Sequence, residues 1–125
     1  MTAPARIALV LGPTLAAVLA TAAAAQAPAA VERGEAVFEY WCATCHGAGP
    51  GMPGTAALRA KYGGKVPAPL ADRTDLTPGS IRFFVRSGVS IMPFFRKTEV
   101  GDADLEALIA YLTRPRSKRE EPQAR

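Results

Sequence analysis

The pattern of hydrophobic and polar positions predicts a helix over residues 31–41 and another over residues 102–113. In both segments apolar or small side chains recur three or four positions apart, which gathers them on one helical face. Gly34 lowers helix stability by about 1 kcal/mol relative to alanine, so we expect another helix to cross closely there. The recurring positions are Val31, Gly34, Val37, Phe38 and Trp41 in the first helix and Leu105, Leu108, Ile109 and Leu112 in the second.

Shorter helices and long loops are predicted between these two. Thr77 is a suitable N-cap and Pro78 suits the first helical position. Apolar residues then recur at helical spacing until Gly88, which can end the helix in the left-handed conformation. A further short helix is predicted over residues 55–62. No segment alternates polar and apolar residues as a strand does, so the sequence predicts an all-α fold whose long loops surround something.

The first 25 residues have the pattern of an export signal. Arg6 gives a short basic start, an apolar run follows over residues 7–20, and three alanines at residues 23–25 supply a cleavage site. We predict cleavage after Ala25 and a periplasmic mature protein. The alternative is an uncleaved membrane anchor, because the apolar stretch approaches the ~20 residues that a spanning helix needs. A Gly-Pro pair at residues 12–13 interrupts that stretch.

The rest of the chain divides into a charge-balanced domain, residues 26–113, and a basic tail, residues 114–125. Residues 31–113 hold nine basic and nine acidic residues, whereas the tail holds five and two. The net charge of +4 therefore comes from the signal and the tail, which argues against a nucleic-acid-binding domain. We expect the tail to be disordered. A domain this small often needs a disulfide, a metal or another bound group in addition to its hydrophobic core. With only two cysteines, a scaffold held by many disulfides is excluded.

The segment Cys42-Ala43-Thr44-Cys45-His46 carries the clearest chemistry. Two thiols at this spacing on a helical turn can each form a thioether with one vinyl group of haem, and the adjoining imidazole can then bind the iron. This attachment takes place outside the cytoplasm, in agreement with the predicted export signal. We therefore predict one covalently attached haem c, held by Cys42, Cys45 and His46.

Met92 is the predicted second axial ligand. His46 is the only histidine, so two histidine ligands from one chain are impossible. Met1 would leave with the signal, and Met52, six residues beyond His46, would have to pass around the ring edge. Met52 as ligand, and Met92 as a gap-filling core residue, remain the alternatives. Ligation by histidine and methionine leaves no open coordination position, which indicates one-electron transfer rather than catalysis.

Three other interpretations of Cys42 and Cys45 compete with haem attachment. An exported dithiol oxidoreductase could use the pair, although such a motif normally follows a strand. A zinc site with His46 would lack a fourth ligand, because the chain has no other cysteine or histidine. A disulfide closed over two intervening residues would stabilise little.

Residues 31–113 resemble the class I c-type cytochromes. Gly34 and Phe38 stand eight and four residues before Cys42, where that family places a glycine and an aromatic residue. Residues 108–112 look like its C-terminal helix. The resemblance implies that the N- and C-terminal helices cross, with Leu108 and Tyr111 against Gly34 and Phe38.

The same resemblance implies a haem wrapped by loops, with His46 and Met92 as axial ligands and no enzyme activity. It further implies a proline carbonyl that accepts a hydrogen bond from His46 Nδ1. Pro50 and Pro53 are both candidates for this carbonyl, and the spacing does not decide between them.

Two segments are similar to the small cytochrome subunits of periplasmic flavocytochromes that oxidise 4-alkylphenols, the p-cresol methylhydroxylase and eugenol hydroxylase type. They are residues 75–78, Asp-Leu-Thr-Pro, and residues 90–95, Ser-Ile-Met-Pro-Phe-Phe. This similarity implies a flavoprotein donor that passes electrons singly to the haem. A free cytochrome c that serves another dehydrogenase or a terminal oxidase is the alternative.

The segment after Met92 predicts where partners dock. An apolar stretch over residues 93–95 precedes Arg96 and Lys97, so we expect an apolar haem edge with cations that steer a partner. Arg82 and Arg86 are expected to add to this charge.

Overall fold

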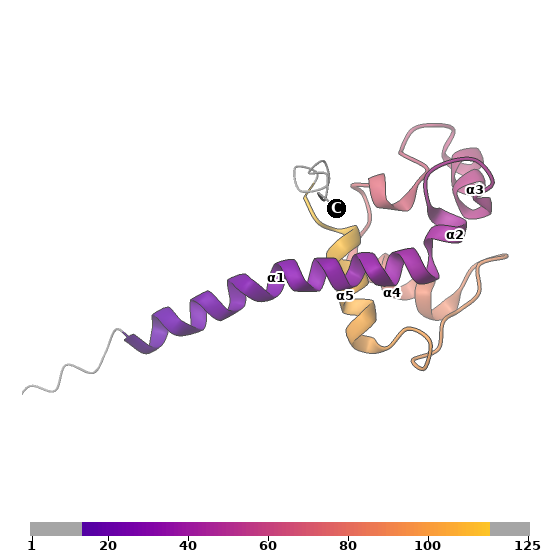
Figure 1. Ribbon diagram of the computed structural model, residues 1–125. Helices are drawn as coiled ribbons and strands as arrows, with labels where there is room; N and C mark the ends of the chain where they lie inside the picture. Colours follow the sequence, from indigo (N-terminus) through magenta and orange to yellow (C-terminus); the bar gives the residue numbers. More distant parts are fainter. Residues whose placement is uncertain (1–13, 116–125) are drawn as a thin grey trace, which may run out of the picture.

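The computed structural model describes residues 14–115, with side chains described from residue 28 onward. A long first helix leads into a cluster of shorter ones (Figure 1). No strand forms within the described residues, where the one β-type pairing is an isolated bridge between Val89 and Met92. The predicted all-α fold is confirmed. The elements are α1 (Thr14–Trp41), α2 (Ala43–His46), α3 (Pro53–Tyr62), the 3-10 helix η1 (Leu70–Asp72), α4 (Pro78–Ser87) and α5 (Asp102–Leu112).

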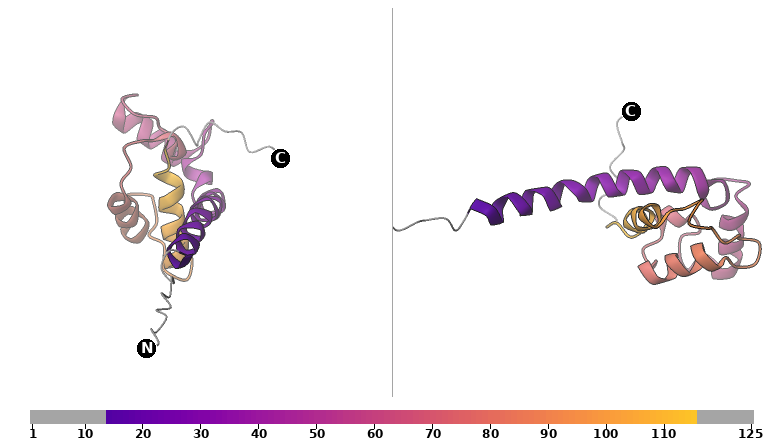
Figure 2. Two further views of the ribbon diagram at one scale, coloured as in Figure 1. Left: turned by 90° about the vertical axis from the view of Figure 1, so that its left-hand side faces the viewer. Right: turned by 90° about the horizontal axis from the view of Figure 1, so that it is seen from below.

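Helix α5 crosses α1 where Gly34 leaves room for it. The two helices pass at a steep angle in Figure 1 and lie against each other in Figure 2. A Cβ atom on Gly34 would stand 2.0 Å from the carbonyl oxygen of Ala107 and 2.7 Å from Cβ of Tyr111. The close crossing that the sequence predicted at Gly34 is therefore confirmed.

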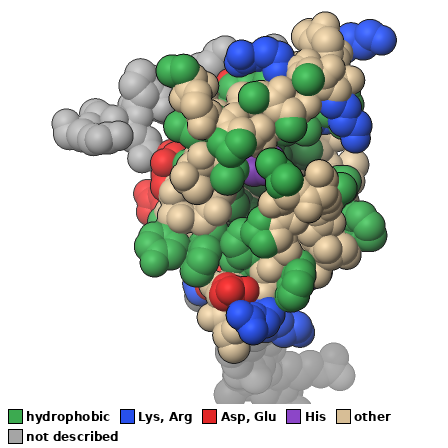
Figure 3. All heavy atoms as spheres, turned by 90° about the vertical axis from the view of Figure 1, so that its right-hand side faces the viewer, with side chains coloured by type: hydrophobic (Ala, Val, Ile, Leu, Met, Phe, Trp, Pro, Cys, Tyr) green, Lys and Arg blue, Asp and Glu red, His purple; other side chains and the backbone are tan. Residues whose placement is uncertain are grey.

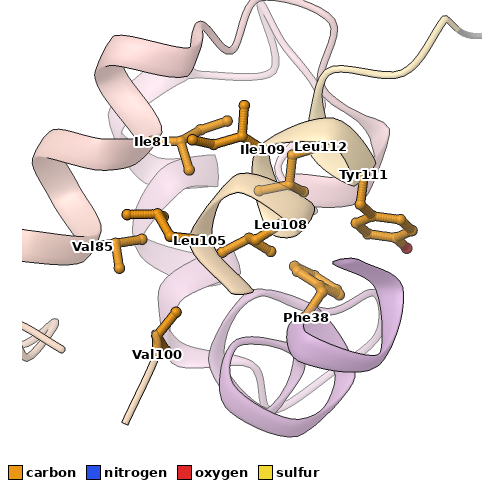
Figure 4. Packing of buried hydrophobic residues seen from close by; sticks show 9 residues of the cluster. All are labelled: Phe38, Ile81, Val85, Val100, Leu105, Leu108, Ile109, Tyr111 and Leu112. Carbon is orange, nitrogen blue, oxygen red and sulfur yellow. The ribbon is translucent and has the colours of Figure 1, made fainter. Parts of the chain in front are cut away.

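The hydrophobic core lies between α1, α4 and α5. Phe38 is 2% exposed and its ring centroid lies 5.5 Å from that of Tyr111, while Leu108 is 1% exposed. Figure 4 shows α5 supplying side chains toward both of the other helices. The cluster consists of Phe38, Ile81, Val85, Val100, Leu105, Leu108, Ile109, Tyr111 and Leu112.

Helix α4 begins as predicted and ends differently. Thr77 and Ser80 form a reciprocal capping box, with Pro78 in the first turn. Gly88 follows the helix with a φ of 66°, but its ψ of 176° is extended and not left-handed helical. The chain turns back here, so that a Cβ on Gly88 would stand 2.6 Å from the carbonyl oxygen of Met92. Both this backbone conformation, which only glycine adopts readily, and the close backbone contact require glycine at this position.

The predicted domain boundaries remain predictions. The cleavage position after Ala25 falls inside α1, which runs without a break from Thr14 to Trp41. Arg6 and the first part of the apolar run lie outside the described residues, as does most of the tail. No helix in the described part of the chain is both long and apolar enough to cross a membrane.

Candidate functional site

The cysteine pair occupies a helical turn at the end of α1. The backbone N–H groups of Cys45 and His46 both donate to the carbonyl of Cys42, at 3.1 and 2.8 Å. Cys42 and Cys45 are free thiols and half-buried. The spacing required for attachment at two points is thus built by local backbone hydrogen bonds.

A cavity of about 370 Å³ brings Met92 together with Cys42 and His46. Figure 3 shows the chain's single histidine at the bottom of a hollow surrounded by hydrophobic side chains. The cavity separates the cysteine turn from α4 and the Met92 segment. Its apolar lining includes Phe38, Leu58, Leu70, Leu76, Ile81, Phe84, Val85, Val89, Leu108 and Leu112.

Met52 lies elsewhere. It lines a second cavity of about 300 Å³, which His46 also borders but to which neither Cys42 nor Met92 contributes. Met52 is also the N-cap residue of α3. Only Met92 therefore shares a cavity with both Cys42 and His46, as the sequence-based preference for Met92 requires.

His46 is held against the start of α3. A Cβ on Gly54 would stand 2.7 Å from Cε1 of His46 and 2.8 Å from Nδ1, so the imidazole packs directly on this glycine. Burial lowers the pKa of His46, which keeps the ring neutral, as a metal ligand must be. Nδ1 is buried without a hydrogen-bond partner among the described residues. In this structure neither Pro50 nor Pro53 therefore supplies the expected carbonyl acceptor.

Thr55 ties the histidine loop to α3. Its side chain is 1% exposed, and its hydroxyl donates to the carbonyl of Gly47 at 2.8 Å. This contact holds the chain directly after His46. The sequence analysis did not identify Thr55, because nothing in the spacing of a lone threonine indicates which loop carbonyl it meets.

Cys42 does not have the environment of a redox-active thiol. Burial, together with the neighbouring Cys45, raises its pKa to about 11. Thioredoxin-type reactivity requires the opposite shift, because the thiolate is the nucleophile. In the described residues no three His, Cys, Asp or Glu side chains are grouped to hold a metal ion, so the zinc arrangement is not formed either.

One end of the large cavity is polar, and the sequence analysis missed it. Arg73 is only 6% exposed there, donates from Nε to Asp75 at 2.9 Å, and lies with its guanidinium carbon 4.6 Å from the ring centroid of Tyr62. The cavity thus offers an apolar body and, at one end, a buried arginine whose guanidinium is paired with the carboxylate of Asp75. These features suit a flat apolar ring system that carries carboxylates.

A comparison with protein families identifies the family of the chain. Residues 29–112 match the family model described as cytochrome c oxidase, cbb3-type, subunit III. The chain belongs to this cytochrome c family. Neither the search of curated proteins nor the search of solved structures found a match.

As a member of this cytochrome c family, the protein carries covalently bound haem c and transfers electrons. The residues present fit that group. The free thiols can form the thioethers, the neutral imidazole borders the same cavity as the Met92 thioether, and the apolar lining excludes water. The histidine Nδ1 without a partner is the one element of the site that the described residues leave unsatisfied.

The cations near the Met92 segment do not form the free charged patch that the sequence suggested. Arg96 pairs with Glu99 at 3.6 Å, Lys97 pairs with Asp102 at 2.8 Å, and Arg82 pairs with Glu106 at 2.6 Å. The apolar side chains beside them are exposed instead, with Ile91 at 76% and Phe94 at 60%. Arg86 and Lys97 share Asp102, so the four cations face three carboxylates. The face around the cavity is therefore apolar, and ion pairs offset most of its positive charge.

Proposed function

We propose that this protein is an exported, periplasmic one-electron carrier with a single haem c. Residues 1–25 are removed as a signal, residues 26–113 form the cytochrome domain, and residues 114–125 remain as a basic tail. Cys42 and Cys45 form the thioethers, and His46 and Met92 are the axial ligands. The observation that carries the ligand assignment is the single cavity lined by Cys42, His46 and Met92.

When bound, haem supplies an iron that cycles between Fe(II) and Fe(III). The protein holds the iron ligands rigidly, so that the change of oxidation state needs little rearrangement of the chain. The α2 turn and Gly54 restrict the imidazole, while Met92 supplies a soft thioether that favours the reduced metal. With both His46 and Met92 bound to the iron, no coordination position would remain for a substrate. Arg73, although paired with Asp75, would place a guanidinium at the polar end of the cavity, where a haem carboxylate could accept a charge-assisted hydrogen bond.

The donor proposed for this carrier is a flavoprotein that oxidises 4-alkylphenols. Support comes from the similarity of residues 75–78 and 90–95 to the cytochrome subunits of such enzymes. A free carrier that serves another dehydrogenase or a terminal oxidase is the competing function. In either case the exposed Ile91 and Phe94 beside the cavity favour docking through apolar contact, with electrostatic steering reduced by the internal ion pairs.

Two measurements test the proposal. A pyridine haemochrome spectrum and an intact mass should show one covalent haem and a chain that begins near Gln26. Met92→Ala should abolish the far-red sulfur-to-iron absorption band of the ferric protein and lower its potential, whereas Met52→Ala should leave both unchanged. Loss of the band in Met52→Ala alone would contradict the ligand assignment, and a chain without haem but with redox-active thiols would instead be a dithiol oxidoreductase.

A further inference from the structure

Arg86 of α4 joins its helix to the chain that follows Met92. Its Nη1 donates to the carbonyl oxygens of Phe95, at 3.0 Å, and Val100, at 2.8 Å. Its Nη2 lies 3.0 Å from Oδ1 of Asp102, at the start of α5. One side chain therefore bridges α4, the segment after Met92 and α5.

These contacts tie the segment after Met92 to α4, whereas the hydrogen bonds between residues 96 and 100 are internal to the segment and Lys97 pairs with Asp102 of α5. Phe95 also donates its backbone N–H to the carbonyl of Val85 at 2.8 Å, and Val100 is 2% exposed. Between these two points the chain makes an exposed turn at residues 96–99. Arg86 fastens both ends of that turn, so it closes the Met92 segment against α4.

On its other side Met92 is held by a tight and strained turn. Val89 and Met92 exchange backbone hydrogen bonds at 3.1 and 2.9 Å. Between them Ser90 adopts a φ of 54°, which is uncommon for a residue other than glycine. Such a conformation persists only where surrounding contacts hold it, and the contacts after Met92 are those of Phe95 and Arg86.

We propose that Arg86 is a positioning residue that keeps the Met92 thioether at the haem iron by holding the carbonyls of Phe95 and Val100. The proposal rests on Met92 being the axial ligand. A thioether is a weak ligand that an added base can displace from ferric iron, and the segment must move outward for displacement to occur. Hydrogen bonds to a charged donor oppose that movement more strongly than neutral ones.

The chain offers a matched control one helical turn earlier. Arg82 also lies on α4, but within residues 28–115 its hydrogen bonds and ion pair are with Glu106 and not with a carbonyl of the Met92 segment. Arg82→Gln therefore removes an equal charge from the same helix without loosening the segment. Arg86→Lys keeps the charge but loses the fork that reaches two carbonyls at once.

The experiment titrates imidazole against the ferric holoprotein and follows the far-red band. Arg86→Gln should bind imidazole at least about tenfold more tightly than wild type, as expected for the loss of charge-assisted hydrogen bonds. Its far-red band should disappear on heating well before far-UV circular dichroism reports unfolding. Arg86→Lys should lie between wild type and Arg86→Gln, and Arg82→Gln should stay within about twofold of wild type.

The outcomes separate this inference from the ligand assignment. If Met92→Ala leaves the far-red band intact, the ligand assignment is wrong and the role of Arg86 fails with it. If Met92→Ala abolishes the band but Arg86→Gln binds imidazole no better than Arg82→Gln, only the positioning role is overturned. Should Arg86→Gln not yield holoprotein, the same comparison is made with Arg86→Lys, and equality with Arg82→Gln again refutes the role.

Discussion

Gly34 of α1 lies directly on the backbone of Ala107 in α5. A Cβ on Gly34 would stand 2.0 Å from the Ala107 carbonyl oxygen, well inside van der Waals contact. The obstructing atom belongs to backbone, so it cannot rotate away. The position of α5 against α1 therefore depends on the absence of a side chain at residue 34.

Gly34→Ala should destabilise the holoprotein. Alanine favours a helix by about 1 kcal/mol over glycine, but overpacking costs about 1–3 kcal/mol or more, and at this distance the two helices must separate. Thermal unfolding followed by circular dichroism should show a lower midpoint. The matched control is Gly79→Ala in α4, where nothing lies within 4 Å of the added atom. A midpoint for Gly34→Ala equal to that of the control would contradict the close crossing.

Acid stability should depend on Asp75. Hydrogen bonding to Arg73 lowers the pKa of Asp75 below its ordinary value. The ionised carboxylate therefore adds stability at pH values above the unfolded pKa of about 3.9, and this is lost as pH falls through the folded-state pKa. Asp75→Asn should be less stable than wild type at pH 6, and the stabilities of the two proteins should converge as the pH falls through the folded-state pKa of Asp75. A difference in stability between the two proteins that persists at low pH would show that Asp75 does not stabilise the fold through its ionised carboxylate.

Arg73→Gln should change how the haem carboxylates titrate. Removing a buried cation raises the pKa of an adjacent carboxylate, by about one unit for each ~1.4 kcal/mol of lost interaction. The reduction potential of the variant should then fall and vary with pH in a higher range than that of wild type. Spectroelectrochemical titration measures both effects. The control is Arg59→Gln, which replaces an exposed arginine on α3. Equal dependence of the reduction potential on pH in the two variants would contradict the proposed contact between Arg73 and a haem carboxylate.

Partner docking should respond to apolar rather than to charged substitutions. Replacing the exposed Ile91 and Phe94 together by serine should slow reduction by a co-purified flavoprotein donor by about tenfold or more, the scale expected when apolar anchors are lost. In the wild-type protein the rate should depend only weakly on ionic strength, because Glu99 and Asp102 offset most of the positive charge of Arg96 and Lys97, and an Arg96→Gln, Lys97→Gln variant serves as the comparison. Stopped-flow measurements at several ionic strengths give both results. If the rate of reduction fell steeply with ionic strength in wild type but not in the variant without Arg96 and Lys97, electrostatic steering by these residues would be supported instead.

Folding should require the haem. The cavity of about 370 Å³ borders core residues of all three packed helices. Without haem these apolar side chains face water, and the hydrophobic stabilisation lost in this way is large compared with the roughly 5–15 kcal/mol that stabilises a small domain. A Cys42→Ala, Cys45→Ala chain made without haem should therefore show no cooperative melting. A sharp thermal transition in that chain would refute the dependence.

The sequence determined what local spacing can encode. Helical periodicity predicted α5 and residues 31–41 of α1, whose start at Thr14 it did not predict. Thr77 with Pro78 predicted the start of α4, and Gly34 predicted a close crossing. The Cys-x-x-Cys-His turn needs only neighbouring residues to form. The prediction of a left-handed Gly88 was wrong in ψ, because the backbone there must accommodate Met92.

Only the tertiary structure decided which distant side chains meet. It brought Met92, and not Met52, into the cavity with Cys42 and His46, and it buried Arg73 at the polar end of that cavity. It also paired Lys97 with Asp102 and turned Arg86 toward two loop carbonyls. Contacts of this kind join residues of different elements, and they depend on how helices pack and loops turn back. Residue spacing along the chain does not contain that geometry.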